Sequence, residues 1–440
     1  MTHQTMRAAT KPSFTRAMAF AFALLLTWSC YSIAPAQAAP WRMSMRQVNV
    51  QQQRESGGDR PYFVTFQFES RLFLRGTTRV DVIEAQPHDW VDKAEHRARG
   101  RVSSTRSHLF NGEVMPLPAW MGELGWGDIN VVPQDAASIL RSNPHVFGAI
   151  VIGFDNNNTP PHVIRNAADQ IATWLKRFLQ QEVEGGRIIN VIDLRAGTVN
   201  EAELRAKFEA FGRSIASEID AGKVIENAFQ LTLGSTFNPD KIVGIHALIF
   251  PAIAGIPVVE RSEAFSAPLV GENVNWSVLV GTAAPISRTL LFQGSGARYA
   301  VPFRLTNSIL PDATTMSSLQ LRIATGEDDL RTNSRLSGFV TLRDGRRSTV
   351  QELNGRRGLG AWSEFTTSIE LPRDTRFRDL QSLTLSFASG STGPFDTTDN
   401  YNIDSVAVML SGGAVALKVV RGRPLVRFTG DSREFTFALR

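Results

Sequence analysis

Two acidic loops in the C-terminal third of the chain carry the residue types that bind a hard cation. One contains Glu327, Asp328 and Asp329, and the other runs from Asp399 to Asp404. Calcium takes about six to eight oxygen ligands from carboxylates, amides and backbone carbonyls. The predicted calcium ligands are Asp328, Asp329, Asp399, Asn402 and Asp404. Neither loop has the spacing of an EF-hand, so the ligands would have to come from both loops.

Two other interpretations of these acids stay open. The carboxylates fit a salt-bridge network with Arg331 and Arg335, and they also fit plain exposure to solvent in turns.

Arginines in turns of the same region form a second candidate site. The predicted anion-binding residues are Arg346, Arg347, Arg356 and Arg357, with Arg343, Arg421, Arg423 and Arg427 as further members of the basic set. A guanidinium group pairs bidentately with phosphate or carboxylate, so lipid headgroups and acidic polysaccharides are candidate ligands. The alternative is a solvated turn surface.

Four motifs that mark common enzyme classes are missing from the sequence. It has no Gly-x-Ser-x-Gly elbow, no His-Glu-x-x-His helix, no P-loop and no dinucleotide glycine fingerprint. The two catalytic carboxylates of a glycosidase are defined by their distance in space and not by a sequence motif, so a glycosidase stays possible. If the first part of the chain is a hydrolase, Asp155, Asn156 and Asn158 are the first residues to test, because they follow an apolar segment. A metal held by His88 and His96 is a further alternative.

The segments before residue 310 indicate an α+β domain. Apolar or alternating segments predict strands, and apolar residues at helical spacing predict two amphipathic helices between them. The predicted strands include 61–69, 78–84, 146–154, 274–280 and 299–305, and the helices are 161–184 and 200–222.

Residues 242–259 are apolar apart from His246, a length close to that of a membrane span. Pro251 and Pro257 disfavour a continuous helix, so we expect buried core strands and turns. The alternative is a segment that inserts into a membrane, as in a membrane-perturbing toxin. Trp120 and Trp126 have the same two interpretations, as interfacial anchors or as core residues.

From residue 317 onward short alternating segments are separated by turns. Asp344-Gly345 and Asn354-Gly355 predict hairpin turns. Regular short strands of this kind predict a β-sandwich over 317–440.

This region resembles the PLAT/LH2 β-sandwich family. The resemblance rests on the strand entering Thr325-Gly326, the Asp-rich loop, the strand 339–342, the segment 380–385 and the closing segment 399–406. It implies a module that docks membranes or protein partners, in some members with calcium at the loops. The loop from Asp328 to Ser334 lacks the family's usual Ala-Gly-Thr run, and strands after Val415 extend past the expected end.

The first 38 residues have the order of a secretory signal peptide. Basic residues precede an apolar segment, and Ala36 and Ala38 suit cleavage before Ala39. Cys30 is the only cysteine, so the mature chain would hold no thiol and no disulfide. The formal charge is +5, and three cations lie in this leader, so the mature chain is nearly neutral and nucleic acid is not an expected partner.

The sequence therefore predicts a secreted or periplasmic, two-domain, non-catalytic binding protein. Its expected partner is a membrane lipid, a surface glycan or another protein, and calcium is the expected cofactor. A secreted hydrolase with a targeting sandwich is the enzyme alternative. The oligomeric state stays open.

Overall fold

The computed structural model describes residues 39–440 apart from a set of gaps. The gaps are 85–95, 99–100, 104–107, 118, 158, 160, 192–193, 195–199, 221–239, 268–271, 283, 308–312, 362, 391–398, 411–415, 430–432 and 440. The predicted signal peptide, the His88 site and the predicted boundary at 310 therefore lie outside the described residues.

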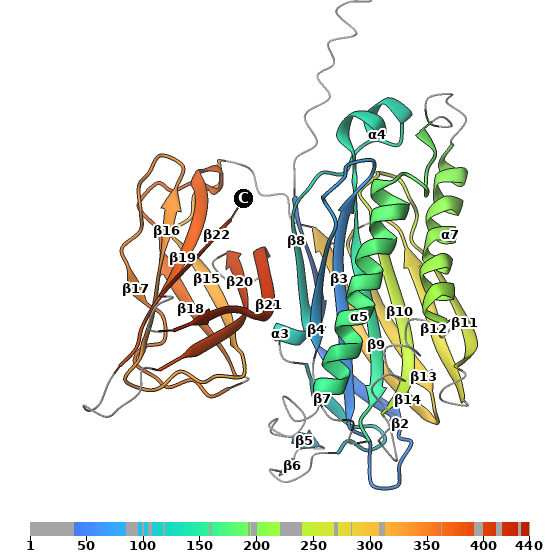
Figure 1. Cartoon of the computed structure of the whole chain (residues 1–440), viewed down its shortest axis with the longest axis horizontal. Coiled ribbons are helices and arrows are strands. Elements are labelled where there is room, and N and C mark those ends of the chain that lie inside the picture. The colour runs from blue at the N-terminus through green and yellow to red at the C-terminus, as the bar shows by residue number, and fades with distance from the viewer. Residues whose placement is uncertain are drawn as a thin grey trace, which may run out of the picture. The chain divides into compact units, whose positions relative to one another are not determined.

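The described chain is rich in strands, and its α-helices lie in the first part (Figure 1). The first part contains β1 (Ala39–Met45), β2 (Gln47–Gln52), β3 (Pro61–Arg71), β4 (Arg79–Glu84), β5 (His96–Ala98), β6 (Arg101–Ser103), β7 (Val114–Pro116), α3 (Ala119–Gly122), β8 (Glu123–Ile129), α4 (Ala136–Ser142), β9 (His145–Asp155), α5 (Pro161–Leu179), η1 (Gln180–Glu184), α7 (Glu201–Asp220), β10 (Lys241–Pro251), β11 (Val259–Ala267), β12 (Glu272–Val280), β13 (Ile286–Gly294) and β14 (Ala297–Asn307). The second part contains β15 (Ser318–Thr325), β16 (Arg335–Leu342), β17 (Gln351–Glu352), β18 (Glu364–Glu370), η2 (Phe377–Asp379), β19 (Leu380–Ala388), β20 (Tyr401–Leu410), β21 (Ala416–Phe428) and β22 (Glu434–Ala438).

One large sheet organises the first part. Its main path runs β4-β3-β9-β10-β12-β13-β14-β1-β8, with β11, β2 and β7 paired beside it. Neighbours are antiparallel except β10 and β12, which run parallel. The first strand, β1, lies between β14 and β8, so the sheet joins segments from the two ends of this part.

The central strands β9 and β10 are buried on both faces, as their near-continuous apolar sequences indicate. Ile150 and Ile152 of β9 face one apolar core, whereas Phe147 and Val151 face another. The helices α5 and α7 cover the first of these faces (Figure 1). Their buried side chains recur at helical spacing, with Ile164, Ile171, Leu175 and Leu179 on α5 and Leu204, Phe208, Phe211 and Ile215 on α7.

A glycine pair lets β13 pack closely on the other face of the sheet. Gly153 of β9 and Gly244 of β10 are register partners, and Phe292 of β13 packs on both. A Cβ at Gly153 would lie 2.6 Å from the Phe292 ring, and one at Gly244 would lie 2.9 Å from the Phe292 Cα. The Phe292 ring also contacts Phe63 of β3, at 5.2 Å between centroids. The sheet therefore folds over itself around this residue.

The second part is a sandwich of two four-stranded sheets. One has the order β18-β15-β20-β21 and the other β17-β16-β19-β22, all antiparallel. Strands alternate between inward apolar and outward polar residues, as in the pattern of β16. The core between the sheets includes stacked rings of Phe387, Tyr401 and Phe428.

The structure confirms the predicted fold class, an α+β region followed by a β-sandwich. Residues 242–259 form β10, a turn that is exposed at Ala254 and Gly255, and the first residue of β11, so most of the segment is core strand as expected. Asn354-Gly355 is not a hairpin turn, because the strands on its two sides, β17 and β18, belong to different sheets. The Gly-Trp-Gly segment 125–127 lies inside β8, where Trp41 is the register partner of Trp126.

None of the helices in the described ranges combines the length and the apolar character needed to span a bilayer.

Candidate functional site

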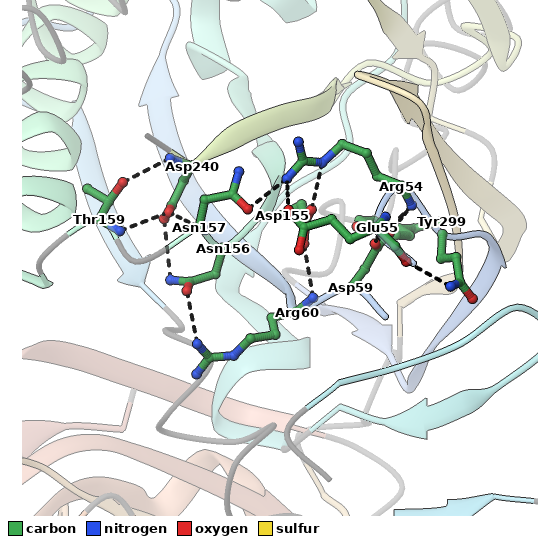
Figure 2. A network of polar contacts seen from close by, with 11 residues as sticks. Arg54, Glu55, Asp59, Arg60, Asp155, Asn156, Asn157, Thr159, Asp240 and Tyr299 are labelled. Carbon is green, nitrogen blue, oxygen red and sulfur yellow. Dashed lines mark hydrogen bonds and ion pairs between the residues drawn. The ribbon is translucent and has the colours of Figure 1, made fainter. Parts of the chain in front are cut away.

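A network of buried acids joins the loop before β3 to the carboxyl end of β9 (Figure 2). Asp155, the last residue of β9, is 1% exposed. Its Oδ1 accepts a hydrogen bond from the Arg60 backbone N–H at 2.9 Å, and its Oδ2 accepts one from Arg54 Nε at 2.9 Å. The predicted strand-end acid therefore exists, and a guanidinium group covers it.

Asp59 is the second acid of this network and is fully buried. It accepts hydrogen bonds from the backbone N–H groups of Arg54 and Glu55, at 2.8 and 3.0 Å, and from the Tyr299 hydroxyl at 2.9 Å. The carboxylate thus fixes the turn that leads from β2 to β3 and ties it to β14.

Asp240, immediately before β10, is the third acid. Its Oδ1 accepts from the backbone N–H groups of Asn157 and Thr159, at 2.6 and 3.0 Å, and its Oδ2 accepts from the Tyr62 hydroxyl at 2.7 Å. These bonds hold the turn between β9 and α5 against β10 (Figure 2).

Burial changes the acidity of these groups. Loss of hydration, with a smaller contribution from the nearby Asp59 charge, raises the pKa of Asp155 to about 6. Burial also raises the pKa of Asp240, against the effect of its hydrogen bonds. The pKa of the Tyr299 phenol lies well above its ordinary value, because the ring is buried beside two carboxylates.

The geometry gives this network a structural role. Every carboxylate oxygen of Asp59, Asp155 and Asp240 accepts at least one hydrogen bond from the chain. Asp59 and Asp155 are also almost fully shielded from solvent. Of the residues proposed for the hydrolase alternative, Asn156 bonds Arg60 and Asp240, and Asn158 lies outside the described residues.

The second candidate region is one end of the sandwich, called here the acidic end. It is formed by residues 326–334 after β15, 353–363 after β17 and 399–400 before β20. Leu330 and Leu359 pair as an isolated bridge, which holds the first two of these loops together.

Asp399 is the anchor of the acidic end. It is 2% exposed, and its Oδ2 accepts from the Ser334 hydroxyl at 2.6 Å and from the Arg331 backbone N–H at 3.1 Å. The Arg331 guanidinium lies 3.4 Å from its Oδ1. These contacts match the salt-bridge interpretation for Arg331.

The other predicted ligands lie beside this anchor. Asp328 has a raised pKa because of burial, and it is close enough to Asp329 and Asp399 for their charges to add to the shift. The Arg427 guanidinium lies 3.8 Å from Asp328. Asp329 is exposed.

Asn402 and Asp404 flank Gly326. The Gly326 N–H donates to the Asn402 carbonyl oxygen at 2.8 Å, and a Cβ at Gly326 would lie 2.4 Å from Asp404 Oδ1. The side-chain oxygen of Asn402 is buried and has no hydrogen-bond partner in the part of the chain that the structure describes.

The described side chains do not form a preorganised metal site. No group of three or more His, Cys, Asp or Glu side chains within the described ranges converges as metal ligands. Arginines lie against two of the predicted ligands instead. The calcium assignment stays a prediction.

The four predicted anion-binding arginines divide between the two ends of the sandwich. Arg346 and Arg347 follow the end of β16, and Arg347 pairs with Thr341 there. Arg356 and Arg357 lie on the acidic end, because β17 pairs with the opposite half of β16 at Ser337 and Gly338. All four side chains are exposed, but an eight-residue strand of roughly 24 Å separates the two pairs.

Trp126 and His246 both belong to the protein core. Trp126 is 3% exposed and donates to the Phe68 carbonyl oxygen at 3.0 Å, in the core opposite the helices. His246 is buried, its Nδ1 is hydrogen bonded to the Ser277 hydroxyl, and burial lowers its pKa to about 4.

Comparison with known proteins shows only faint similarity. No family model matches the chain, and no curated protein matches it. One similar solved structure is a LOX variant in complex with arachidonate, at 13% identity, with 28% of this chain and 16% of that chain covered and a TM-score of 0.22. The alpha toxin from Clostridium absonum is 13% identical over 30% of this chain and 33% of that chain, with a TM-score of 0.23. A pair of C2 domains from extended synaptotagmin 2 is 8% identical over 99% of this chain and 97% of that chain, with a TM-score of 0.20.

The matched part thus spans a third or less of the LOX and alpha-toxin chains. Similarity this low does not establish a shared fold, so the assignment of a β-sandwich rests on the strand pairing.

Proposed function

We propose that this chain is an exported, non-catalytic binding protein that docks on a surface through its C-terminal β-sandwich, in the manner of the PLAT/LH2 family. The observation that supports this proposal is the gathering of Asp328, Asp329 and Asp399 from two separate loops at one end of the sandwich. Asp328 and Asp329 reach solvent at this end, where loops on a rigid scaffold commonly carry binding residues. The buried Asp399 holds the loops together.

Calcium is the cation proposed for the acidic end. It would have to displace Arg427 from Asp328 and Arg331 from Asp399. That competition makes us expect weak binding, in the range of extracellular modules, about 10⁻⁴ to 10⁻³ M.

The test of the calcium part is a thermal melt of the mature protein with and without calcium. Calcium at roughly a hundred times its Kd should stabilise the protein by about 2.7 kcal/mol. The Asp328→Asn, Asp329→Asn double variant should lose this shift. The Asp344→Asn, Asp374→Asn variant is the matched control, because it removes two exposed carboxylates from the opposite end of the sandwich.

The docking part is tested separately, by sedimentation with lipid vesicles and by glycan arrays, each with calcium and with a chelator. Binding that does not respond to calcium would remove the ion from the proposal and leave docking intact. Absence of binding to every vesicle and glycan, with and without calcium, would overturn the docking function.

A further inference from the structure

The end of the sandwich opposite the acidic end is rich in arginine. It is called here the basic end, and it is formed by residues 343–350 after β16 and 371–379 after β18. The two loops touch, because Arg346 Nη1 donates to the Arg373 carbonyl oxygen at 3.4 Å and the Arg343 N–H donates to the Asp379 carbonyl oxygen at 2.8 Å. The exposed arginines of this end are Arg343, Arg346, Arg347, Arg373, Arg376 and Arg378.

Acidic side chains balance only part of this charge. Asp344 pairs with Arg346 at 2.7 Å, and Asp379 lies 3.8 Å from Arg378. Asp374 is the third acid of the two loops. In the described chain, Arg343, Arg373 and Arg376 take part in no ion pair, so these three exposed cationic side chains have no counterion among the described residues.

The arrangement of these side chains is partly fixed. The Arg347 guanidinium lies over the Phe339 ring, 5.2 Å from its centroid, a cation–π contact that orients the group. The Asp344 carboxylate accepts from both the backbone N–H and the Nε of Arg346, at 2.9 and 2.7 Å. The Asp344 contacts therefore hold Arg346 at the turn, and the Phe339 contact holds Arg347 against β16.

An exposed apolar side chain belongs to the same loop. Val350 is 65% exposed, more than any other large apolar side chain in the described chain. Val350 directly precedes Gln351, which pairs with Gly338 of β16, so it lies further along the hairpin than the arginines of the turn. Arginines at the turn of a hairpin that also carries an exposed apolar residue fit a membrane surface, which offers anionic phosphates at the headgroups and an apolar layer below them. A soluble polyanion offers only the charge.

We propose that the basic end binds the phosphate headgroups of an anionic phospholipid membrane, without calcium. This inference rests on the proposed docking function and assigns it to a different end of the sandwich from the calcium site. The guanidinium forks of Arg343, Arg373 and Arg376 pair with phosphate oxygens, and Val350 contacts the interface.

The test is sedimentation of the mature protein with vesicles of phosphatidylcholine and phosphatidylglycerol, in the presence of a chelator. Vesicles of phosphatidylcholine alone are the lipid control. The Arg343→Gln, Arg373→Gln variant should bind about 25-fold more weakly, since each arginine near an anionic surface contributes about fivefold. The Arg356→Gln, Arg357→Gln variant removes the same charge from the acidic end and should bind like the wild type. All variants should melt like the wild type, because the four side chains are exposed.

Three results would overturn this inference. Equal loss of binding in both variants would show that net charge alone is responsible. Binding that needs calcium and ignores Arg343→Gln, Arg373→Gln would assign docking to the acidic end, and the proposed function would survive. Binding of the wild type to heparin but to no vesicle would make the partner a polysaccharide.

Discussion

At the scale of single residues, the chain keeps three acids inside the protein and satisfies them with its own donors. Asp59, Asp155 and Asp240 each hold a turn next to a central strand. A buried carboxylate is costly unless it is fully hydrogen bonded. These residues therefore connect loops to strands through hydrogen bonds. Because the pKa values of Asp155 and Asp240 differ between the folded and the unfolded state, the stability of the fold depends on pH.

Asp155 makes that stability depend on pH. Its folded-state pKa of about 6 lies above the ordinary value of 3.8, so the folded state binds more protons between these values. Asp155 should therefore lower the free energy of unfolding by up to about 3 kcal/mol as the pH rises through this window. The lowered pKa of His246 acts in the opposite direction there. The Asp155→Asn variant should lose the Asp155 contribution, so its stability should rise with pH relative to that of the wild type, as measured by urea unfolding at several pH values.

The control for this titration is Asp344→Asn. Hydrogen bonds from Arg346 lower the pKa of Asp344, so that group titrates below the window and the slope should not change. Equal pH slopes in the wild type and the Asp155→Asn variant would contradict the role assigned to Asp155.

At the scale of elements, the contact between β13 and the central strands depends on two glycines. A side chain at Gly153 would collide with the Phe292 ring. Gly153→Ala should therefore lower the free energy of unfolding by about 2 kcal/mol, as overpacking in a core does. Chemical denaturation measures this change.

Gly57 supplies the matched control. A Cβ there would meet nothing within 4 Å, so Gly57→Ala should change the stability by less than about 0.5 kcal/mol. A Gly153→Ala variant as stable as this control would show that β13 is not held against the sheet as described.

The elements with strong periodicity could be predicted from the sequence. The helix stripe of Ile164, Ile171 and Leu175 and the apolar segment before Asp155 were sufficient for α5 and β9. Strands such as β8 could not be predicted, because Gly125 and Gly127 surround Trp126 and glycine normally marks a loop. Only pairing with β1 makes this segment a strand.

The candidate sites show the same limit. The acidic loops and the arginines were visible as residue types, but their distribution between two ends of the sandwich depends on which strands pair. The hydrogen bond between Asp59 and Tyr299 could not be predicted from the sequence around either residue. The two residues are far apart in the chain, and only the sheet brings them together.

At the scale of the whole molecule, the described strands of the sandwich pair only with one another, and its core contains only residues 319–439. We therefore expect residues 313–440 to fold when expressed alone. Calorimetry should show one cooperative transition, and circular dichroism should show a strand-rich spectrum. A gradual, non-cooperative melt would mean that the predicted division near residue 310 does not separate independent folding units.

The position of β1 has a consequence for the order of events during folding. Met43 pairs with Leu305 of β14 on one side and with Leu124 of β8 on the other. The strand β1 can therefore form hydrogen bonds on both of its sides only after β14 has been synthesised. Strand pairings between segments this distant in sequence form slowly. Until then the edges of β8 and β14 are open to other chains, so the folding yield should fall as the protein concentration rises and recover when a chaperone covers those edges.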